Sequence, residues 1–327
     1  MIKYGVIKKQ RKNILITGAS VGLGLEVARL LIEKDEYNLF LTARASSLTR
    51  FIENGITPSK HIHLEALDVT DASMRLQLIQ KINETAGGVD ILINNAGFTF
   101  RSVLEDVSDN DQIQQMETNF RAPMQLIRLC LPYMRDKRAG QIINISSVGG
   151  MMAMPTMGIY SASKHALEGA SESLWYEVRP WNIKVTLLSP GFINSKGFEK
   201  VRKTWMSNAS MENSSSTYFE HYKNMEGFVE RIMKKTPSTS YSVAKKVLKV
   251  IEAKNPPLRV TATWDALVFK LMKAVIPQRL YHAILYYSLP GIRKWGRRPK
   301  ITRIKGQVKD EKNLSTVSKS KIKTKAS

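Results

Sequence analysis

Short apolar runs alternate with helix-forming segments along the first 190 residues of the chain. The apolar runs occupy residues 14–17, 38–44, 61–69, 89–97, 141–147 and 183–191. Amphipathic or helix-forming stretches lie between them, at residues 23–35, 71–86, 111–135 and 160–180. Strands that alternate with helices at this spacing form βαβ units, so consecutive strands run parallel with right-handed crossovers. The pattern therefore predicts an α/β protein with a doubly wound, Rossmann-type parallel sheet.

The rest of the chain divides by composition. Residues 192–240 combine a polar, low-complexity stretch with Met- and aromatic-containing segments, which is typical of a mobile lid over a substrate. A helix at 242–254 and a last strand at 256–261 complete the sheet. We therefore predict a single domain over residues 1–262. An amphipathic helical extension at 263–290 and a basic, disordered tail at 291–327 follow it.

The charge of the chain is unevenly distributed. Its net charge is +22, and residues 291–327 hold thirteen lysine or arginine residues and two acidic ones. Such a tail either solubilises the protein or is attracted to an anionic lipid surface or to nucleic acid. Its one aromatic residue, Trp295, together with Tyr281, Tyr286 and Tyr287, favours a membrane surface for residues 280–298. For residues 264–276, packing on the protein's own substrate cleft or on a subunit partner is slightly favoured.

Targeting and metal signals are absent from the sequence. The N-terminus has no apolar stretch after its cations, and no run approaches the roughly 20 apolar residues of a membrane span. One cysteine, Cys130, excludes a disulfide framework, and the five histidines show no metal-ligand spacing. We expect a cytoplasmic protein without a metal, with peripheral membrane association as the open question.

Two residues carry the first chemical signal. Tyr160 and Lys164 lie four residues apart in a helix-forming segment, so they share one helix face. A phenol is a poor proton donor at neutral pH, but a neighbouring ammonium group stabilises its anion. The pair therefore indicates acid–base chemistry.

A glycine-rich turn carries the second signal. Gly18, Gly22 and Gly24 join the first strand to the first helix, where backbone N–H groups bind a pyrophosphate. The second strand ends at Ala43 and Arg44, where NAD-selective sheets usually carry an acid. Because an arginine pairs with a 2′-phosphate, the sequence favours NADP(H) over NAD(H).

The motifs TGASVGLG, LDVT, NNAG, NISS, YSASK and SPG stand in the order of the short-chain dehydrogenase/reductase family. The chain resembles this family over residues 12–195, and the stretch 147–169 resembles its 17β-hydroxysteroid and retinol dehydrogenase branch. The resemblance implies that Tyr160 is the catalytic tyrosine and that Lys164 lowers its pKa. It further implies that Ser147 is the catalytic serine and that Asn119 bends its helix and holds a water.

The resemblance also implies the residues that bind the cofactor. Pro190, Gly191 and Ile193 face the nicotinamide, and Ser195 stands where the family often has threonine. The remaining cofactor-binding candidates come from the four strand ends before them, and Tyr160 and Lys164 contribute as well. These candidates are Thr17, Gly18, Ser20, Gly22, Leu23, Gly24, Arg44, Asp68, Val69, Asn95, Ala96 and Gly97.

The sequence thus predicts an oxidoreductase that interconverts an alcohol and a carbonyl on a steroid-, retinoid- or fatty-chain-like substrate with NADP(H). Two alternatives stay open. One is a 3-oxoacyl thioester reductase, because the same site reduces that group. The other is a non-catalytic protein that binds membrane or nucleic acid, although nucleic acid is disfavoured. The resemblance implies a homodimer or homotetramer.

Overall fold

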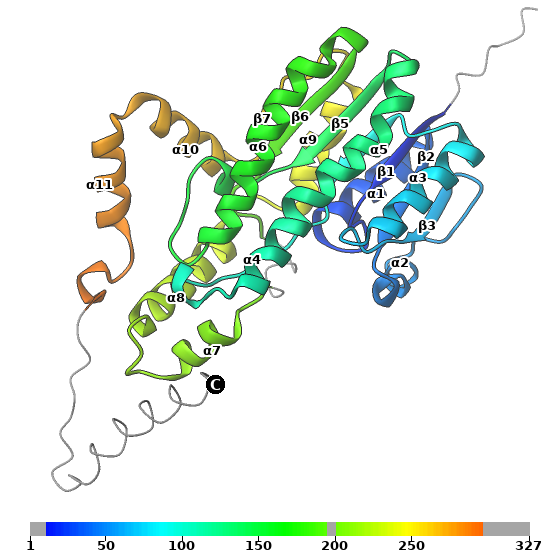
Figure 1. Ribbon diagram of the computed structural model, residues 1–327. Coiled ribbons are helices and arrows are strands. Elements are labelled where there is room, and N and C mark those ends of the chain that lie inside the picture. The colour runs from blue at the N-terminus through cyan, green and yellow to red at the C-terminus, as the bar shows by residue number, and fades with distance from the viewer. Residues whose placement is uncertain (1–10, 195–200, 297–327) are drawn as a thin grey trace, which may run out of the picture. The chain divides into compact units, whose positions relative to one another are not determined.

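The computed structural model of the protein describes residues 11–194 and 201–296. Seven parallel strands form one sheet in the order β3-β2-β1-β4-β5-β6-β7 (Figure 1). The strands are β1 Lys12–Ile16, β2 Tyr37–Ala43, β3 Ile62–Ala66, β4 Ile91–Asn94, β5 Gly140–Ile145, β6 Ile183–Ser189 and β7 Arg259–Thr261. The order changes direction between β1 and β4, which confirms the expected doubly wound sheet. Ligands of such sheets bind at the carboxyl ends of the strands beside this point.

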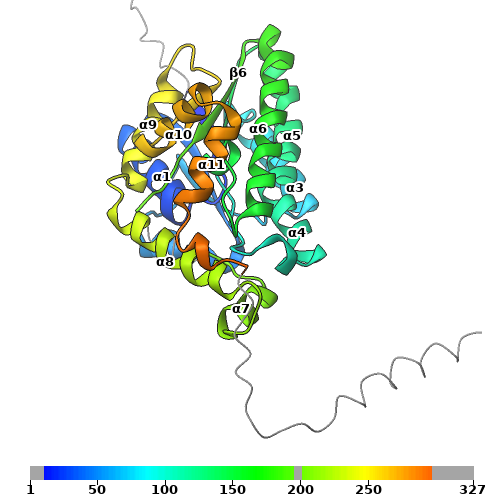
Figure 2. The ribbon, with the colours of Figure 1, turned by 90° about the vertical axis from the view of Figure 1, so that its left-hand side faces the viewer.

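Helices cover both faces of the sheet (Figure 2). One face carries α1 Gly22–Lys34 and α9 Ser240–Glu252, which pack against each other. The other face carries α3 Ala72–Ala86, α5 Ala122–Asp136 and α6 Gly158–Val178. The short α2 Thr49–Glu53 follows β2, and α4 Asp109–Met116 precedes α5.

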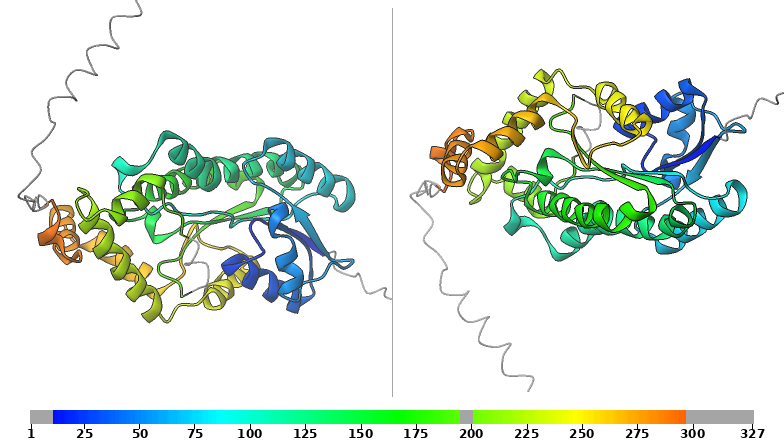
Figure 3. Two further views of the ribbon diagram at one scale, coloured as in Figure 1. Left: turned by 90° about the horizontal axis from the view of Figure 1, so that it is seen from below. Right: turned by 90° about the horizontal axis from the view of Figure 1, so that it is seen from above.

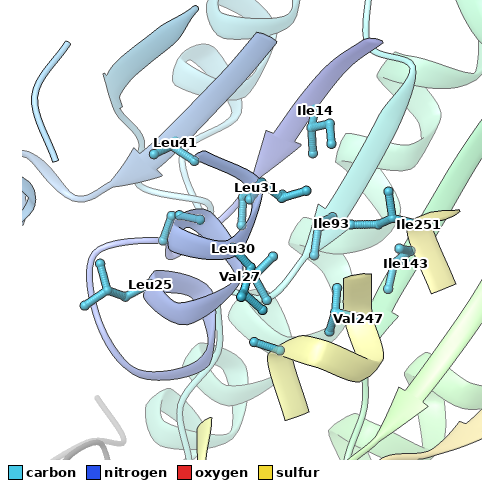
Figure 4. Packing of buried hydrophobic residues seen from close by; sticks show 14 of the residues in the cluster. Ile14, Leu25, Val27, Leu30, Leu31, Leu41, Ile93, Ile143, Val247 and Ile251 are labelled. Carbon is cyan, nitrogen blue, oxygen red and sulfur yellow. The ribbon is translucent and has the colours of Figure 1, made fainter. Parts of the chain in front are cut away.

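The core lies between these layers. In β1, Ile14 and Ile16 point to the α1/α9 side and Leu15 points to the α3/α5 side, because successive side chains of a strand alternate. All three are fully buried, as expected for a strand covered on both faces. Figure 4 shows Ile14 among Val27, Leu31 and the α9 residue Val247.

The segments after β6 form four further helices on one side of the sheet, α7 Trp205–Glu212, α8 Phe219–Lys235, α10 Trp264–Val275 and α11 Gln278–Ser288 (Figure 3). Much of the stretch 192–240, predicted as a lid, is therefore helical. In α8, Tyr222, Met225 and Val229 are buried.

The helical extension predicted for residues 263–290 consists of two helices, α10 and α11. Ile276 is extended, with ψ 129°, and Pro277 follows it. A proline has no N–H to donate and forces the preceding residue out of the helical conformation, so the helix ends at Val275. Among the described residues no helix is long and apolar enough to cross a membrane.

Candidate active site

Tyr160 and Lys164 lie one turn apart at the start of α6. The Lys164 Nζ is 6.0 Å from the centre of the Tyr160 ring and donates a hydrogen bond of 2.9 Å to the carbonyl of Ile145, the last residue of β5. Burial lowers the pKa of Lys164 to about 8, while the charge of Glu168 acts in the opposite direction. The ammonium group is thus enclosed at the carboxyl end of the sheet.

Ser147 follows β5 and approaches the same tyrosine. Burial raises the pKa of the Tyr160 phenol above its usual value, and a hydrogen bond with the Ser147 hydroxyl offsets part of this rise. Gly149 makes the approach possible, since a Cβ there would lie 3.0 Å from the Tyr160 ring. The two hydroxyls expected to act together are therefore in contact.

Asn119 lies in a π-helical turn, Glu117–Arg121, between α4 and α5. Its side chain is buried, accepts from the N–H of Phe98 at 3.1 Å and donates to the Phe98 carbonyl at 2.9 Å. A Cβ on Gly97 would lie 3.1 Å from Asn119 Oδ1 and 3.8 Å from Lys164 Nζ. Single π-helical turns inside helices are frequent at functional sites. Here the turn brings Asn119 to the end of β4, beside Lys164.

The glycine turn joins β1 to α1, and its Gly18 and Gly24 pack too closely on their neighbours to carry a side chain. Gly18 has φ +65° and Gly22 has φ +59°, both in the left-handed region that favours glycine. A Cβ on Gly24 would lie 2.4 Å from the carbonyl oxygen of Gly18. Val21 precedes the helix and supplies no side-chain cap to its first N–H groups. The N-terminus of α1 can therefore accept an anion.

Several predicted cofactor residues brace this turn through contacts within the protein. The buried hydroxyl of Thr17 accepts from the N–H groups of Asn95 and Ala96, each at 3.0 Å. The Asn95 amide donates to the carbonyls of Thr17 and Gly18. Ser20 is buried and Leu23 is partly buried. These residues connect β1 to β4 at the edge where the cofactor is expected.

Two arginines and one acid gather beside β2 and β3. Arg44 is exposed directly after β2, and Val69 is buried in the core. Although burial acts to raise the pKa of Asp68, hydrogen bonds from Thr70 and the charges of Arg44 and Arg202 lower it. Arg202 comes from the lid and lies 4.2 Å above the Phe98 ring. The sequence did not single out Arg202, because it follows no motif.

The loop after β6 is held by the start of the C-terminal extension. The N–H of Gly191 donates to the Thr263 hydroxyl, and the N–H of Phe192 donates to the Asp265 carboxylate, each at 2.8 Å. Pro190 accepts from the N–H of Val148 at 2.7 Å, which ties the loop to the Ser147 segment. Ile193 is partly buried against the core, and Ser195 lies outside the described residues.

Sequence reasoning missed Thr263 and Asp265 because the pattern there is that of an amphipathic helix. A Thr-x-Asp triplet before an apolar run is a common helix start, and that signal was available.

A surface depression lies at the start of α6. It has a volume of about 590 Å³, and Gly158, two residues before Tyr160, contributes to its wall. The other lining residues are Val103, Leu104, Glu105, Met154, Pro155, Thr156 and Tyr218. The hydroxyl of Tyr218 donates to Glu105, so the lid contacts the loop after β4 across this depression.

The parallel sheet, its glycine turn and the tyrosine–lysine pair at the strand ends define an oxidoreductase of the Rossmann type. The chain belongs to the short chain dehydrogenase family, whose model matches residues 12–205. It is 33% identical over 283 residues to 3-ketodihydrosphingosine reductase of Bacteroides thetaiotaomicron, covering 86% of this chain and 99% of that protein. It is 32% identical over 205 residues to dehydrogenase/reductase SDR family member 7B of Xenopus laevis, covering 59% of this chain and 64% of that protein.

Solved structures agree with this assignment. A short-chain dehydrogenase from Streptomyces avermitilis superposes with a TM-score of 0.70 at 26% identity, covering 84% of this chain and 98% of that chain. ElxO, solved with NADP bound, superposes with a TM-score of 0.64 at 26% identity, covering 79% of this chain and 99% of that chain.

Proposed function

We propose that the protein interconverts an alcohol and a carbonyl group on an apolar substrate with NADP(H). The observation that carries the proposal is the convergence of Tyr160, Ser147 and Lys164 at the strand ends beside the glycine turn. This arrangement places a proton donor, a second hydroxyl and a buried cation together. Relatives named as reductases support it.

The residues present fit NADP(H). The N-terminus of α1 has no side-chain cap, and a Cβ at Gly22 would meet nothing within 4 Å, so a pyrophosphate could approach the backbone there. Lys164 would hold the nicotinamide ribose, and the exposed Arg44 would hold the 2′-phosphate. Arg202, from the lid, lies in the same region, as the effect of its charge on both Arg44 and Asp68 indicates. The structure of ElxO with NADP bound supports this choice of cofactor.

The reaction requires a hydride, which NADPH supplies when bound. Tyr160 and Ser147 donate hydrogen bonds to the substrate oxygen, which becomes negatively charged as the carbonyl is reduced. Tyr160 gives its proton to this oxygen, and in the alcohol direction it removes that proton. Lys164 stabilises the tyrosinate that results. Asn119 holds Gly97 and Phe98 in place and, as the family resemblance implies, positions the water that returns the proton.

Replacing Arg44 by alanine should weaken NADPH binding much more than NADH binding, since only NADPH carries the phosphate. A charge-assisted hydrogen bond contributes about 1.5–3 kcal/mol, so we expect a loss of roughly ten- to a hundredfold in NADPH affinity. Fluorescence titration of both cofactors measures the effect. Arg128→Ala, an exposed arginine on α5, is the control and should change neither affinity. Equal weakening of both cofactors would show that Arg44 does not select the phosphate.

We infer that the substrate is a fatty-chain-like ketone. The depression beside Gly158 is lined by Val103, Leu104, Met154 and Pro155, and Leu104 is exposed. A related protein, 3-ketodihydrosphingosine reductase, carries a ketone substrate in its name. NADPH turnover with 3-ketodihydrosphingosine, a long-chain 3-oxoacyl thioester, a steroid ketone and retinal tests this choice. If the protein turns over none of these four substrates, the proposal is wrong.

We further propose that α10 and α11 bring the site to an anionic membrane surface. Phe269, Met272, Ile276 and Leu285 pack on Val148 and Met152, so the extension covers the segment after Ser147. The outer side of α11 leaves Leu280, Ile284 and Tyr287 exposed by 54%, 40% and 76%. Lys270, Lys273, Arg279 and Lys294 are exposed nearby. An apolar helix face flanked by cations is typical of interfacial membrane binding.

The membrane-facing residues differ from those expected. Tyr281 is 4% exposed and packs on Val148 and Met152, so it cannot enter a membrane. The Trp295 ring lies 4.3 Å from that of His221 in α8. In α10, Phe269 and Met272 pack on the protein, whereas Trp264, Leu271 and Val275 are exposed. The reason is that these helices carry apolar residues on more than one side, and among the described residues only the inner side packs against other segments. The homodimer or homotetramer stays a prediction.

A double substitution on α11, Leu280→Glu and Ile284→Glu, should abolish sedimentation with anionic phosphatidylserine vesicles at low salt. Both side chains are exposed, so the fold should survive, while two charges replace the apolar contacts. The control, Ile52→Glu with Leu76→Glu, makes the same change at exposed sites on α2 and α3 and should still sediment. If wild-type protein stays in the supernatant, the membrane proposal is wrong.

A further inference from the structure

Glu168 is a buried carboxylate one helical turn beyond Lys164 on α6. It is 5% exposed and faces the sheet. A buried carboxylate is costly unless it is paired and hydrogen-bonded. Neither a motif nor the family resemblance assigns Glu168 a role.

Three hydrogen-bonding groups and one glycine surround this carboxylate. Its Oε1 accepts from the Ser146 hydroxyl at 2.8 Å and from the Ser189 hydroxyl at 3.1 Å. Its Oε2 pairs with the guanidinium of Arg259 on β7. A Cβ on Gly150 would lie 3.0 Å from Oε1, so glycine leaves the space that the carboxylate fills. One side chain thus connects the ends of β5 and β6 and the start of β7 to α6.

These contacts adjoin the proposed catalytic groups. Ser146 directly precedes Ser147, and Ser189 directly precedes the Pro190–Gly191 loop. Lys164, on the same helix face as Glu168, is enclosed and bonded to the Ile145 carbonyl. We propose that Glu168 is a positioning residue, which aligns Ser147 and the Pro190 loop with Tyr160 and supplies the counter-charge that keeps Lys164 protonated. This inference rests on the proposed function.

The role of Glu168 as a counter-charge follows from the charged and titratable groups around Lys164. Burial lowers its pKa to about 8, and the Glu168 charge raises it. Tyr160 is the other titratable group that faces it from α6. Arg259 faces Glu168 from β7, and it is shared with the more exposed Glu172, 2.7 Å from its other guanidinium nitrogen. Without the Glu168 charge, Lys164 should lose its proton at lower pH.

The geometry also indicates that the Glu168–Arg259 ion pair does more than stabilise the fold. A buried ion pair is weak evidence for stability, because desolvation offsets most of the attraction. Glu172 could pair with Arg259 at the surface without any buried charge. Instead, the buried carboxylate is Glu168, which lies one helical turn from Lys164. At that position its negative charge acts on the Lys164 ammonium group.

The test follows NADPH binding across pH 6–10, because Lys164 is proposed to hold the nicotinamide ribose. Wild-type affinity should fall as Lys164 loses its proton. In Glu168→Gln we expect the midpoint of this fall to move to lower pH by about one unit, the size of shift that a neighbouring charge produces. Glu172→Gln removes the other partner of Arg259 and should leave the midpoint unchanged. The double variant Glu168→Gln with Arg259→Gln replaces the ion pair by two amides and should show the same shift.

The outcomes separate the two proposals. A Glu168→Gln midpoint equal to that of wild type and Glu172→Gln would overturn the inference and leave the catalytic proposal standing. Failure of both Glu168 variants to fold would also overturn it, since the pair would then be a requirement of the fold. If wild-type protein binds no NADPH, or Tyr160→Phe retains full turnover, the proposed function itself is wrong.

Discussion

Tyr160→Phe is expected to lower the rate of carbonyl reduction by roughly 10²–10⁴-fold, the usual loss when a general acid is removed. The ring stays, so packing against Gly149 is kept, but the proton donor in contact with Ser147 is gone. NADPH binding should survive, because Lys164 and the glycine turn are unchanged. Steady-state kinetics and cofactor titration of the purified variant measure both quantities.

The control for this variant is Tyr176→Phe, which removes the same hydroxyl from an exposed position on the same helix. It should keep wild-type turnover and cofactor affinity. If Tyr160→Phe keeps half of its turnover, proton transfer must come from another group and the mechanism proposed here is wrong.

Gly24→Ala should weaken NADPH binding by about ten- to a hundredfold and also lower the free energy of unfolding. The added Cβ would lie 2.4 Å from the Gly18 carbonyl oxygen and 2.5 Å from the Asn95 amide nitrogen, so the turn must move. Overpacking at such a site typically costs about 1–3 kcal/mol. Denaturant unfolding with and without NADPH separates the stability loss from the binding loss.

Gly169→Ala on α6 is the matched control, because a Cβ there meets nothing within 4 Å. Alanine favours a helix over glycine, so this variant should be as stable as wild type or more stable. Unchanged NADPH affinity in Gly24→Ala would show that the turn between β1 and α1 does not hold the cofactor.

The parallel sheet was predictable because its signals are local. Each strand is a short apolar run and each helix has its own periodicity, and the connections between parallel strands allow few arrangements. The four-residue spacing of Tyr160 and Lys164 likewise places both on one helix face, because a helix brings residues four apart together. Pro277 also carried a local signal, a helix end, which the apolar pattern of residues 264–291 obscured.

Contacts between distant segments were not predictable. Asp265 follows Phe192 by more than seventy positions and yet accepts its N–H. Glu168 bonds to Ser146, Ser189 and Arg259, which belong to three different strand ends. Neither acid differs in sequence from an ordinary helix-surface residue, because a polar side chain in a helix carries no mark of what it will face.

The sequence by itself determined the order of strands and helices, the glycine turn and the spacing of Ser147, Tyr160 and Lys164, since each depends on residues close together in the chain. Tertiary structure decided that Tyr281 is buried while Tyr287 is exposed, although both lie on α11. It also decided that Glu168 is buried beside Lys164. The physical reason is that burial and the local electric field depend on which segments pack against a residue, and those segments come from distant parts of the chain.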